Sequence, residues 1–403
     1  MMKQKIITAV LIASLFILGI SATAWYYQHK ITLQAAQNSQ QVKQMQAQLQ
    51  ATQKQLADQS KSSNHNNINT QAVNRLTTVQ QQWLQQKLAD NHFSGTVLIV
   101  HNNQMLYQAG RGYANYAQQK LTTPETTYQI ASVQKSLTAA LVMKAVEAGK
   151  LRLTDSIAQY YPKIPNGQQI TLQMMLDMRS GLFEPTGPKE VLSDPARLKF
   201  AVDHLQVKNI GQHAYSPVNY LLLVGVLEQA THQSYQQLVN RQLIEANEIQ
   251  DVGFVANVGK TQATSYAFKN NYYGDAIEVP RYSFTSELGT GNMYANVSGL
   301  YRIEQAIQQG KVIKQTTLQQ LRHKQDGTYI GGVYNRPNYF YSHGIEYGYE
   351  SAIQMSQDGN SGVVLLSNQY KADPVLVLTM NAIYQQFCQN TQPVGNNQKA
   401  LAP

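Results

Sequence analysis

The sequence predicts an α/β fold in which an antiparallel sheet is flanked by helices, with a largely helical region inserted between its strands. Three observations support this fold class. A strand pair with alternating apolar residues starts at Phe93 and turns at Asn102-Asn103, and a second strand-rich stretch covers 339–368. Between them, apolar residues recur at helical spacing from Leu137 onward. Residues 72–391 are long enough to bury a substantial core and are assigned to one domain.

The N-terminus contains an apolar run from Ile6 to Trp25, preceded by Lys3 and Lys5. At about 1.5 Å per residue this run spans the roughly 30 Å hydrocarbon core of a bilayer. Residues 1–27 are therefore predicted to be an anchor in the cell membrane, a single pass that leaves the following domain outside the cytoplasm. Alternatively, a signal peptidase cleaves near Ala24 and the protein is secreted.

Two further segments flank the domain. Residues 28–71 are rich in Gln, Asn, Ser and Ala and are predicted to form a polar stalk. Within the stalk, four apolar residues fall near heptad spacing, which leaves a short coiled coil open; they are Val42, Met45, Leu49 and Leu56. Residues 392–403 are predicted to be a disordered tail.

The chain carries a net charge of +9, from 32 basic and 23 acidic residues. The basic residues are scattered, which argues against nucleic acid. An anionic membrane face or cell-envelope polymer is the better partner, and simple solubility is an equally open explanation. The single cysteine, Cys388, allows no intramolecular disulfide and is expected to pack in the core. No metal-ligand spacing or cofactor motif is present, so neither a metal nor a cofactor is expected.

Ser132 and Lys135 lie three residues apart at the start of the predicted helix, which should end near Gly149. A serine hydroxyl needs a neighbouring base, and a desolvated lysine can act as one. A serine N–H at a helix start can also stabilise an oxyanion. The S-x-x-K pattern alone is weak, since an exposed Ser/Lys pair would look the same.

The surrounding sequence is more specific. The segments "FSGTVLIV" and "YQIASVQKSLTAALVMKAVEAGKLRLTDSIAQYYPKIPNGQQITLQMMLDMRSGL" resemble the serine β-lactamase-related family. That family includes class C β-lactamases, penicillin-binding proteins with D,D-carboxypeptidase activity, esterases and teichoic-acid D-alanyl esterases. The resemblance covers about residues 90–390 and implies a β-lactamase/transpeptidase-like fold. It also implies that Ser132 is the nucleophile and Lys135 its base.

The second motif of that family is a tyrosine, usually followed two residues later by asparagine. The match is "YSPVNYLLLVGVLEQ", which begins at Tyr215. The resemblance implies that Tyr215 passes a proton to the leaving group. Pro217 occupies the asparagine position, and Asn219 follows two residues later as a candidate substrate contact. A buried structural tyrosine is the alternative interpretation.

The third motif, usually Lys-Thr-Gly, is matched by "YSHGIEYGYES". With Gly348-Tyr349 as the following Gly-aromatic pair, the ungapped register places Ser342, His343 and Gly344 on the motif. Ile345 would then supply the second oxyanion-hole N–H. A shift of one residue would instead make His343 the first motif residue. Substrate binding is therefore assigned to 342–345.

The departures of the second and third motifs from the family pattern affect the expected substrate. Relatives that act on D-Ala-D-Ala peptides or β-lactams use the motif lysine to contact a substrate carboxylate, and Ser342 replaces it here. A D-alanyl ester on teichoic or lipoteichoic acid has no such carboxylate, so the sequence favours a D-alanyl esterase. The alternatives are a D,D-carboxypeptidase or β-lactamase acting on peptidoglycan peptides or β-lactams, and a non-catalytic envelope-binding protein.

Overall fold

The structure, a computed structural model, describes residues 72–257, 259, 261–371 and 374–389. The predicted anchor, stalk and tail lie outside these residues. Within the described part of the chain, none of the helices combines the length and the apolar character that crossing a membrane requires.

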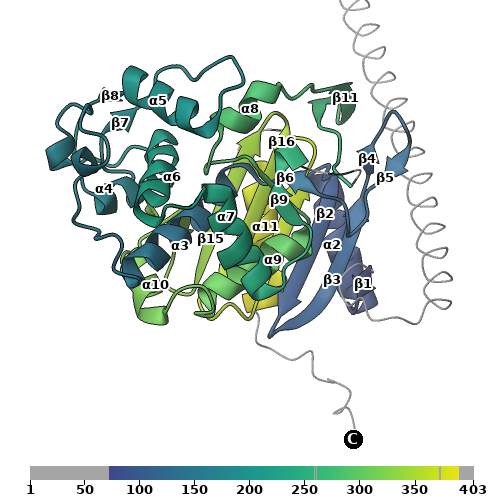
Figure 1. Cartoon of the computed structure of the whole chain (residues 1–403). Helices are drawn as coiled ribbons and strands as arrows, with labels where there is room; N and C mark the ends of the chain where they lie inside the picture. Colours follow the sequence, from purple (N-terminus) through teal and green to yellow (C-terminus); the bar gives the residue numbers. More distant parts are fainter. Residues whose placement is uncertain (1–71, 258, 260, 372–373, 390–403) are drawn as a thin grey trace, which may run out of the picture. The chain divides into compact units, whose positions relative to one another are not determined.

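The central element is an eight-stranded sheet in the order β1-β3-β2-β17-β16-β15-β14-β13 (Figure 1). All of its neighbouring strands are antiparallel. The strands are β1 (Val73–Asn74), β2 (Gly95–His101), β3 (Gln104–Arg111), β13 (Tyr329–Ile330), β14 (Val333–Asn335), β15 (Tyr339–Glu346), β16 (Tyr349–Ser356) and β17 (Gly362–Ser367). The predicted sheet, built from the strands after Phe93 and those of 339–368, is confirmed.

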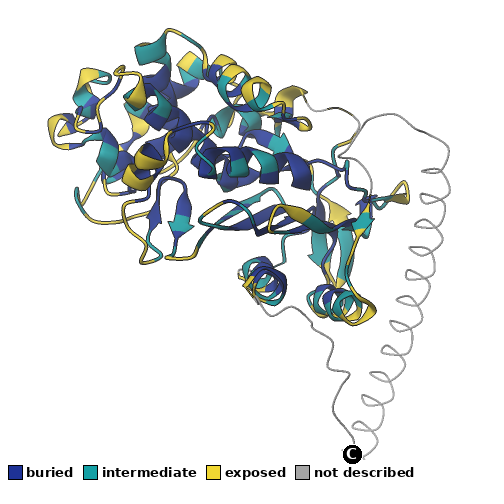
Figure 2. Ribbon diagram, turned by 90° about the horizontal axis from the view of Figure 1, so that it is seen from below, coloured by how far each residue is buried: buried dark blue, intermediate teal, exposed yellow. Residues whose placement is uncertain are grey.

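Helices cover both faces of this sheet, and alternate residues of its strands pack against different helices. On β17, Val364 and Leu366 belong to the core shared with the inserted helical region. Val363 and Leu365 instead pack with α2 (Thr78–Asp90) and α11 (Val375–Tyr384). Figure 2 shows these two buried layers on either side of the strands. The free Cys388 is buried in the second layer, as expected.

The inserted region follows the first strands and contains eight α-helices among the described residues. They are α3 (Gln134–Glu147), α4 (Leu172–Leu176), α5 (Asp194–His204), α6 (Val218–Thr231), α7 (Tyr235–Val239), α8 (Arg281–Ser286), α9 (Val297–Gln308) and α10 (Gln315–Leu321). Short strands complete it: β4 (Tyr113–Asn115) with β5 (Lys120–Leu121), β6 (Tyr128–Gln129) and β9 (Val252–Phe254) with β12 (Met293–Ala295), β7 (Leu182–Phe183) with β8 (Gln206–Val207), and β10 (Tyr266–Lys269) with β11 (Tyr272–Ala276).

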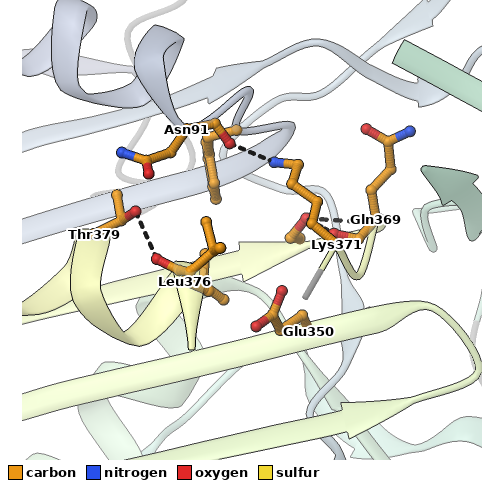
Figure 3. A pocket seen from close by; sticks show the side chains of 9 residues that line it. Asn91, Glu350, Gln369, Lys371, Leu376 and Thr379 are labelled. Carbon is orange, nitrogen blue, oxygen red and sulfur yellow. Dashed lines mark hydrogen bonds between the residues drawn. The ribbon is translucent and has the colours of Figure 1, made fainter. Parts of the chain in front are cut away.

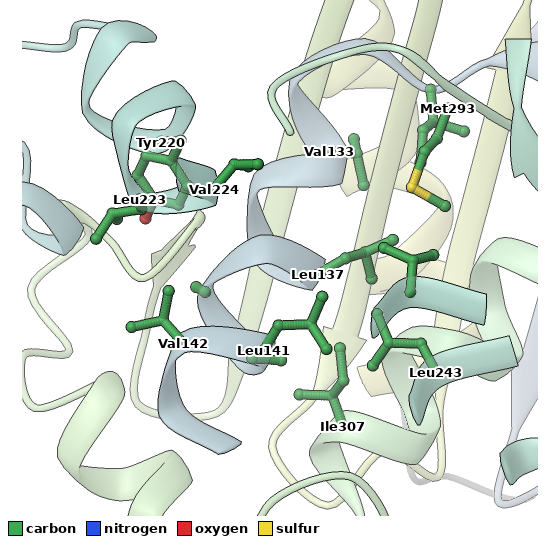
Figure 4. Packing of buried hydrophobic residues seen from close by; sticks show 14 of the residues in the cluster. Val133, Leu137, Leu141, Val142, Tyr220, Leu223, Val224, Leu243, Met293 and Ile307 are labelled. Carbon is green, nitrogen blue, oxygen red and sulfur yellow. The ribbon is translucent and has the colours of Figure 1, made fainter. Parts of the chain in front are cut away.

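Helix α3 lies at the centre of this region. All of its residues except Lys144, Val146 and Glu147 are buried, which is typical of a helix enclosed by others rather than amphipathic on a surface. Leu137 and Leu141 pack among side chains from the neighbouring helices (Figure 4). The 3-10 turn Ala131–Val133 leads directly into α3, so residue 132 is held by a rigid, buried helix.

Candidate active site

Two side chains converge on the hydroxyl of Ser132. The Lys135 Nζ donates a hydrogen bond to Ser132 Oγ at 2.9 Å, and the Tyr215 hydroxyl donates to the same oxygen, also at 2.9 Å. Lys135 is fully buried, whereas Ser132 is partly exposed. A serine hydroxyl in contact with both an amine and a phenol has the groups that can perform acyl transfer.

The lysine is held by the loop that precedes β12. Its Nζ also donates to the backbone carbonyl oxygen of Thr290 at 3.0 Å, and it lies 5.4 Å from the centre of the Tyr215 ring. The aliphatic part of the side chain is enclosed by the α3 core. The amine therefore has a defined position beside Ser132 Oγ, at a distance that permits direct proton transfer.

The turn that carries Ser132 approaches strand β15 closely. Ala131 has a φ of 46°, in the left-handed region that non-glycine residues rarely adopt. A Cβ atom added to Gly344 would lie 2.6 Å from Ser132 N and 2.8 Å from the Ile130 carbonyl oxygen. Only glycine permits this approach, so β15 runs directly past the Ser132 N–H.

Tyr215 lies on the loop before α6 and is 44% exposed, so the alternative of a buried structural tyrosine is wrong. Its ring makes an edge contact with Tyr329 of β13, with centroids 5.1 Å apart. The Tyr329 hydroxyl is buried and has no hydrogen-bond partner among the described residues, and burial raises the pKa of Tyr329 well above its usual value. Sequence reasoning missed this second tyrosine, whose ring supports the position of Tyr215.

Asn219 lies in the first turn of α6 and its side chain is buried. Its Nδ2 donates to the Ser216 carbonyl oxygen at 3.0 Å, and its Oδ1 accepts a hydrogen bond from Ser180. The amide therefore joins two segments of the protein. The structure does not bring it to a surface where it could contact substrate.

Ser342 shares a face of β15 with Gly344 but is fully buried. Its hydroxyl donates to the carbonyl oxygen of Gly332 at 3.2 Å. Gly332 lies in the turn between β13 and β14, and a Cβ atom there would collide with the backbone of Lys135 and Ser136. A small residue at 342 thus lets this turn pack against the start of α3, and a lysine at this position would have to displace the turn.

His343 points to the other face of the sheet. Its Nε2 lies 2.9 Å from Glu350 Oε1, and Glu350 lines a small pocket with Lys371 and residues of α11 (Figure 3). Adjacent strand residues face opposite sides, so this placement follows from Gly344 facing Ser132. The pocket has a volume of about 10 Å³, about the space that one water molecule needs. The structure does not bring the His343 side chain to the nucleophile.

We therefore expect His343→Ala to lower stability and leave catalysis nearly intact. Removing one partner of a buried pair leaves Glu350 without its hydrogen bond, which destabilises by about 1–3 kcal/mol. Thermal unfolding should show a lower Tm, while kcat/KM for a small ester stays within about threefold of wild type. A selective loss of kcat/KM with an unchanged Tm would indicate that His343 contributes to the substrate site.

Two acidic residues near the nucleophile were also missed from the sequence. Glu346 ends β15 on the face of Gly344, and Glu287 accepts a hydrogen bond from the Thr290 hydroxyl at 2.7 Å. Burial and the Glu287 carboxylate raise the pKa of Glu346 to about 8, while Lys135 acts in the opposite direction. No local motif signals this pair, because 59 positions separate its members.

A serine hydroxyl joined to a buried lysine and a tyrosine, on a helix beside an antiparallel sheet, defines a serine hydrolase of the β-lactamase fold. The family model described as Beta-lactamase matches residues 81–383, and the chain belongs to this family.

Similar proteins agree with this assignment. PbpX of Bacillus subtilis (strain 168), whose name places it among candidate penicillin-binding proteins, is 27% identical over 73% of this chain and 75% of its own length. The teichoic acid D-alanine hydrolase of Staphylococcus aureus (strain NCTC 8325 / PS 47) is 27% identical over 62% of this chain and 64% of its own length, less than two thirds of that protein. The crystal structure of FmtA from S. aureus shares the fold, with a TM-score of 0.70, 22% identity and coverage of 86% of this chain and 97% of that one.

Proposed function

We propose that the protein is a D-alanyl esterase that removes D-alanine from teichoic or lipoteichoic acid outside the cytoplasm. Ser132 attacks the ester carbonyl, and Lys135 takes the hydroxyl proton. The N–H groups of Ser132 and Ile345 stabilise the oxyanion. Tyr215 then gives a proton to the departing alcohol oxygen, and water releases D-alanine from Ser132.

The contact of Ser342 with Gly332 is the observation that supports this substrate class. The side chain at the position of the family's lysine is buried and bonded to the backbone. It therefore offers no cation to a substrate carboxylate beside the scissile bond. A charge-assisted hydrogen bond contributes about 1.5–3 kcal/mol, so its loss should weaken carboxylate recognition about ten- to a hundredfold.

The name of the S. aureus hydrolase gives independent support. A D,D-carboxypeptidase is the second candidate, because PbpX is named after penicillin-binding proteins. A non-catalytic envelope-binding protein is a weaker candidate, since the Ser132–Lys135–Tyr215 contacts supply the groups that acyl transfer needs.

The charge distribution supports contact with a polyanion through the N-terminal part of the chain. Beyond the predicted anchor, residues 28–71 contain four lysines and one acidic residue, whereas residues 72–389 contain 25 basic and 22 acidic residues. Relative to its length, the predicted stalk therefore carries more net positive charge than the domain. Salt should weaken the reaction on a polymer more than the reaction on a small neutral ester.

The full chain is expected to release free D-alanine from D-alanylated lipoteichoic acid and to act at least tenfold more slowly on a pentapeptide ending in D-Ala-D-Ala. Mass spectrometry measures both products, with Ser132→Ala as the control for spontaneous ester hydrolysis. Efficient cleavage of the peptide with no action on the polymer would reject the esterase and favour the carboxypeptidase.

A further inference from the structure

Glu346 is the last residue of β15, two positions after Gly344. Residues two apart on a strand share a face and are separated by about 6.8 Å. Because a Cβ atom at Gly344 would contact Ser132 N, the Glu346 side chain leaves the strand on the side of the nucleophile. An acyl group bound to Ser132 Oγ would lie alongside this part of β15.

The carboxylate of Glu346 is half-buried, and among the described residues it forms no hydrogen bond or ion pair. Other buried carboxylates of the protein have partners: Glu350 contacts His343, and Glu304 contacts Arg322. Burying a carboxylate without a partner is unfavourable. Glu346 therefore does not have the surroundings of a structural ion pair.

Glu287 is a second acidic residue beside the turn that carries Ser132. A Cβ atom at Gly291 would lie 3.3 Å from Glu287 Oε2 and 3.4 Å from Ala131 Cα, so Gly291 separates this carboxylate from the residue preceding Ser132. Thr290 connects Glu287 with Lys135, since its hydroxyl donates to the Glu287 carboxylate and its carbonyl oxygen accepts from Lys135 Nζ. The influence of Glu287 on the pKa of Glu346 shows that the two carboxylates interact.

We propose that Glu346, with support from Glu287, binds the α-ammonium group of an aminoacyl ester whose carbonyl carbon is attacked by Ser132. This inference rests on the proposed function. In a D-alanyl ester the amino group is free and cationic, and its nitrogen lies about 2.5 Å from the carbonyl carbon. In a D-Ala-D-Ala peptide the corresponding nitrogen belongs to an amide bond and is neutral. Glu346 thus selects a free aminoacyl group, whereas the family's lysine selects a carboxylate.

The test compares three glycerol esters that differ only in the acyl group: D-alanyl, N-acetyl-D-alanyl and propionyl. The full chain should show a kcat/KM about ten- to a hundredfold higher for the D-alanyl ester than for the two neutral esters, the factor that corresponds to one charge-assisted contact. Glu346→Gln preserves the shape and removes the charge, and it should lower the D-alanyl to propionyl ratio by about tenfold or more. A general structural defect would lower all three rates together and leave the ratio unchanged.

Two further variants make the comparison complete. Glu245→Gln, at an exposed position of the helical region, removes the same charge away from the nucleophile and should keep the wild-type ratio. Glu287→Gln should lower the ratio less than Glu346→Gln, and it tests the assignment independently if the latter folds poorly.

The stability of Glu346→Gln provides a readout that does not depend on activity. A bound ammonium group favours the carboxylate form of Glu346, so the charged contact forms only with the aminoacyl ester in place. Without substrate, the folded protein keeps this carboxyl protonated up to about pH 8, whereas the unfolded chain loses the proton near 4.5. The folded state thus binds more protons in this window, and stability falls as pH rises through it. Glu346→Gln should therefore have a higher Tm than wild type at pH 8, by about 2–4 °C, and a smaller difference at pH 5.

The outcomes separate the two proposals. Equal wild-type rates on the D-alanyl and propionyl esters, or equal loss on all three esters in Glu346→Gln, would overturn the role of Glu346 and leave a serine esterase in place. Cleavage of none of the esters, with trimming of a D-Ala-D-Ala peptide, would instead overturn the proposed function.

Discussion

Ser132→Ala is expected to lower kcat/KM for ester hydrolysis by about 10³–10⁶-fold, and Lys135→Met by a similar factor. The hydroxyl and the amine form one unit, joined by the 2.9 Å contact between Ser132 Oγ and Lys135 Nζ. Removing either group leaves the other without a function. The double variant should therefore be no slower than the slower single variant, and steady-state kinetics on a small ester measures all three.

Matched controls separate this loss from unfolding. Ser193→Ala and Lys150→Ala change exposed residues, the latter at the far end of the α3 segment, and both should keep wild-type rates. Circular dichroism should show that Ser132→Ala is folded, because the serine is only partly buried. A double variant much slower than either single one would indicate that Ser132 and Lys135 act independently. Labelling of Ser132→Ala by a fluorophosphonate would show that another residue is the nucleophile.

The sequence alone predicted the sheet and the Ser132–Lys135 contact because both depend on local periodicity. Alternation of apolar residues defines β2, β3 and the C-terminal strands. The three-residue spacing places Ser132 and Lys135 on one side of the turn that begins α3. The Asn102-Asn103 turn was also predictable, and both residues have the positive φ that a two-residue hairpin requires.

The alternation of side chains along a strand could have predicted that His343 faces away from Ser132, because Gly344 was already expected to face it. The burial of Asn219 and Ser342 could not be predicted, since it depends on Ser180 and on the turn at Gly332, both remote in sequence. The same holds for Glu346 and Glu287. Their proximity to Lys135 arises only when β15 and the segment after α8 meet beside α3.

Gly344→Val is expected to reduce kcat by about 10²–10³-fold while Ser132, Lys135 and Tyr215 are all retained. The first added carbon would lie 2.6 Å from Ser132 N, 2.8 Å from the Ile130 carbonyl oxygen and 3.0 Å from Ala131 Cβ. Two of these three atoms belong to the backbone and cannot rotate away. Strand β15 and the nucleophile turn must therefore move apart, which shifts Ile345 N–H relative to Ser132 N–H.

The size of this effect follows from the proposed oxyanion hole. Loss of one oxyanion donor typically lowers kcat by about 10²–10³-fold, and a displacement of about 1 Å can cost a factor of 10². Gly344→Ala should give a smaller loss, because it adds one carbon instead of three. Rates of ester hydrolysis and of fluorophosphonate labelling should fall together, since both reactions need the oxyanion site.

Gly149→Ala is the matched control for this substitution. Gly149 has a φ of 68°, but a Cβ atom there would meet no atom within 4 Å. The change should destabilise the protein by about 1 kcal/mol through backbone strain and leave kcat unchanged. Wild-type kcat in Gly344→Val, with a normal Tm, would show that β15 does not supply the second oxyanion donor. The close passage of β15 past Ser132 N would then serve packing, and the donor would have to come from another element beside Ser132.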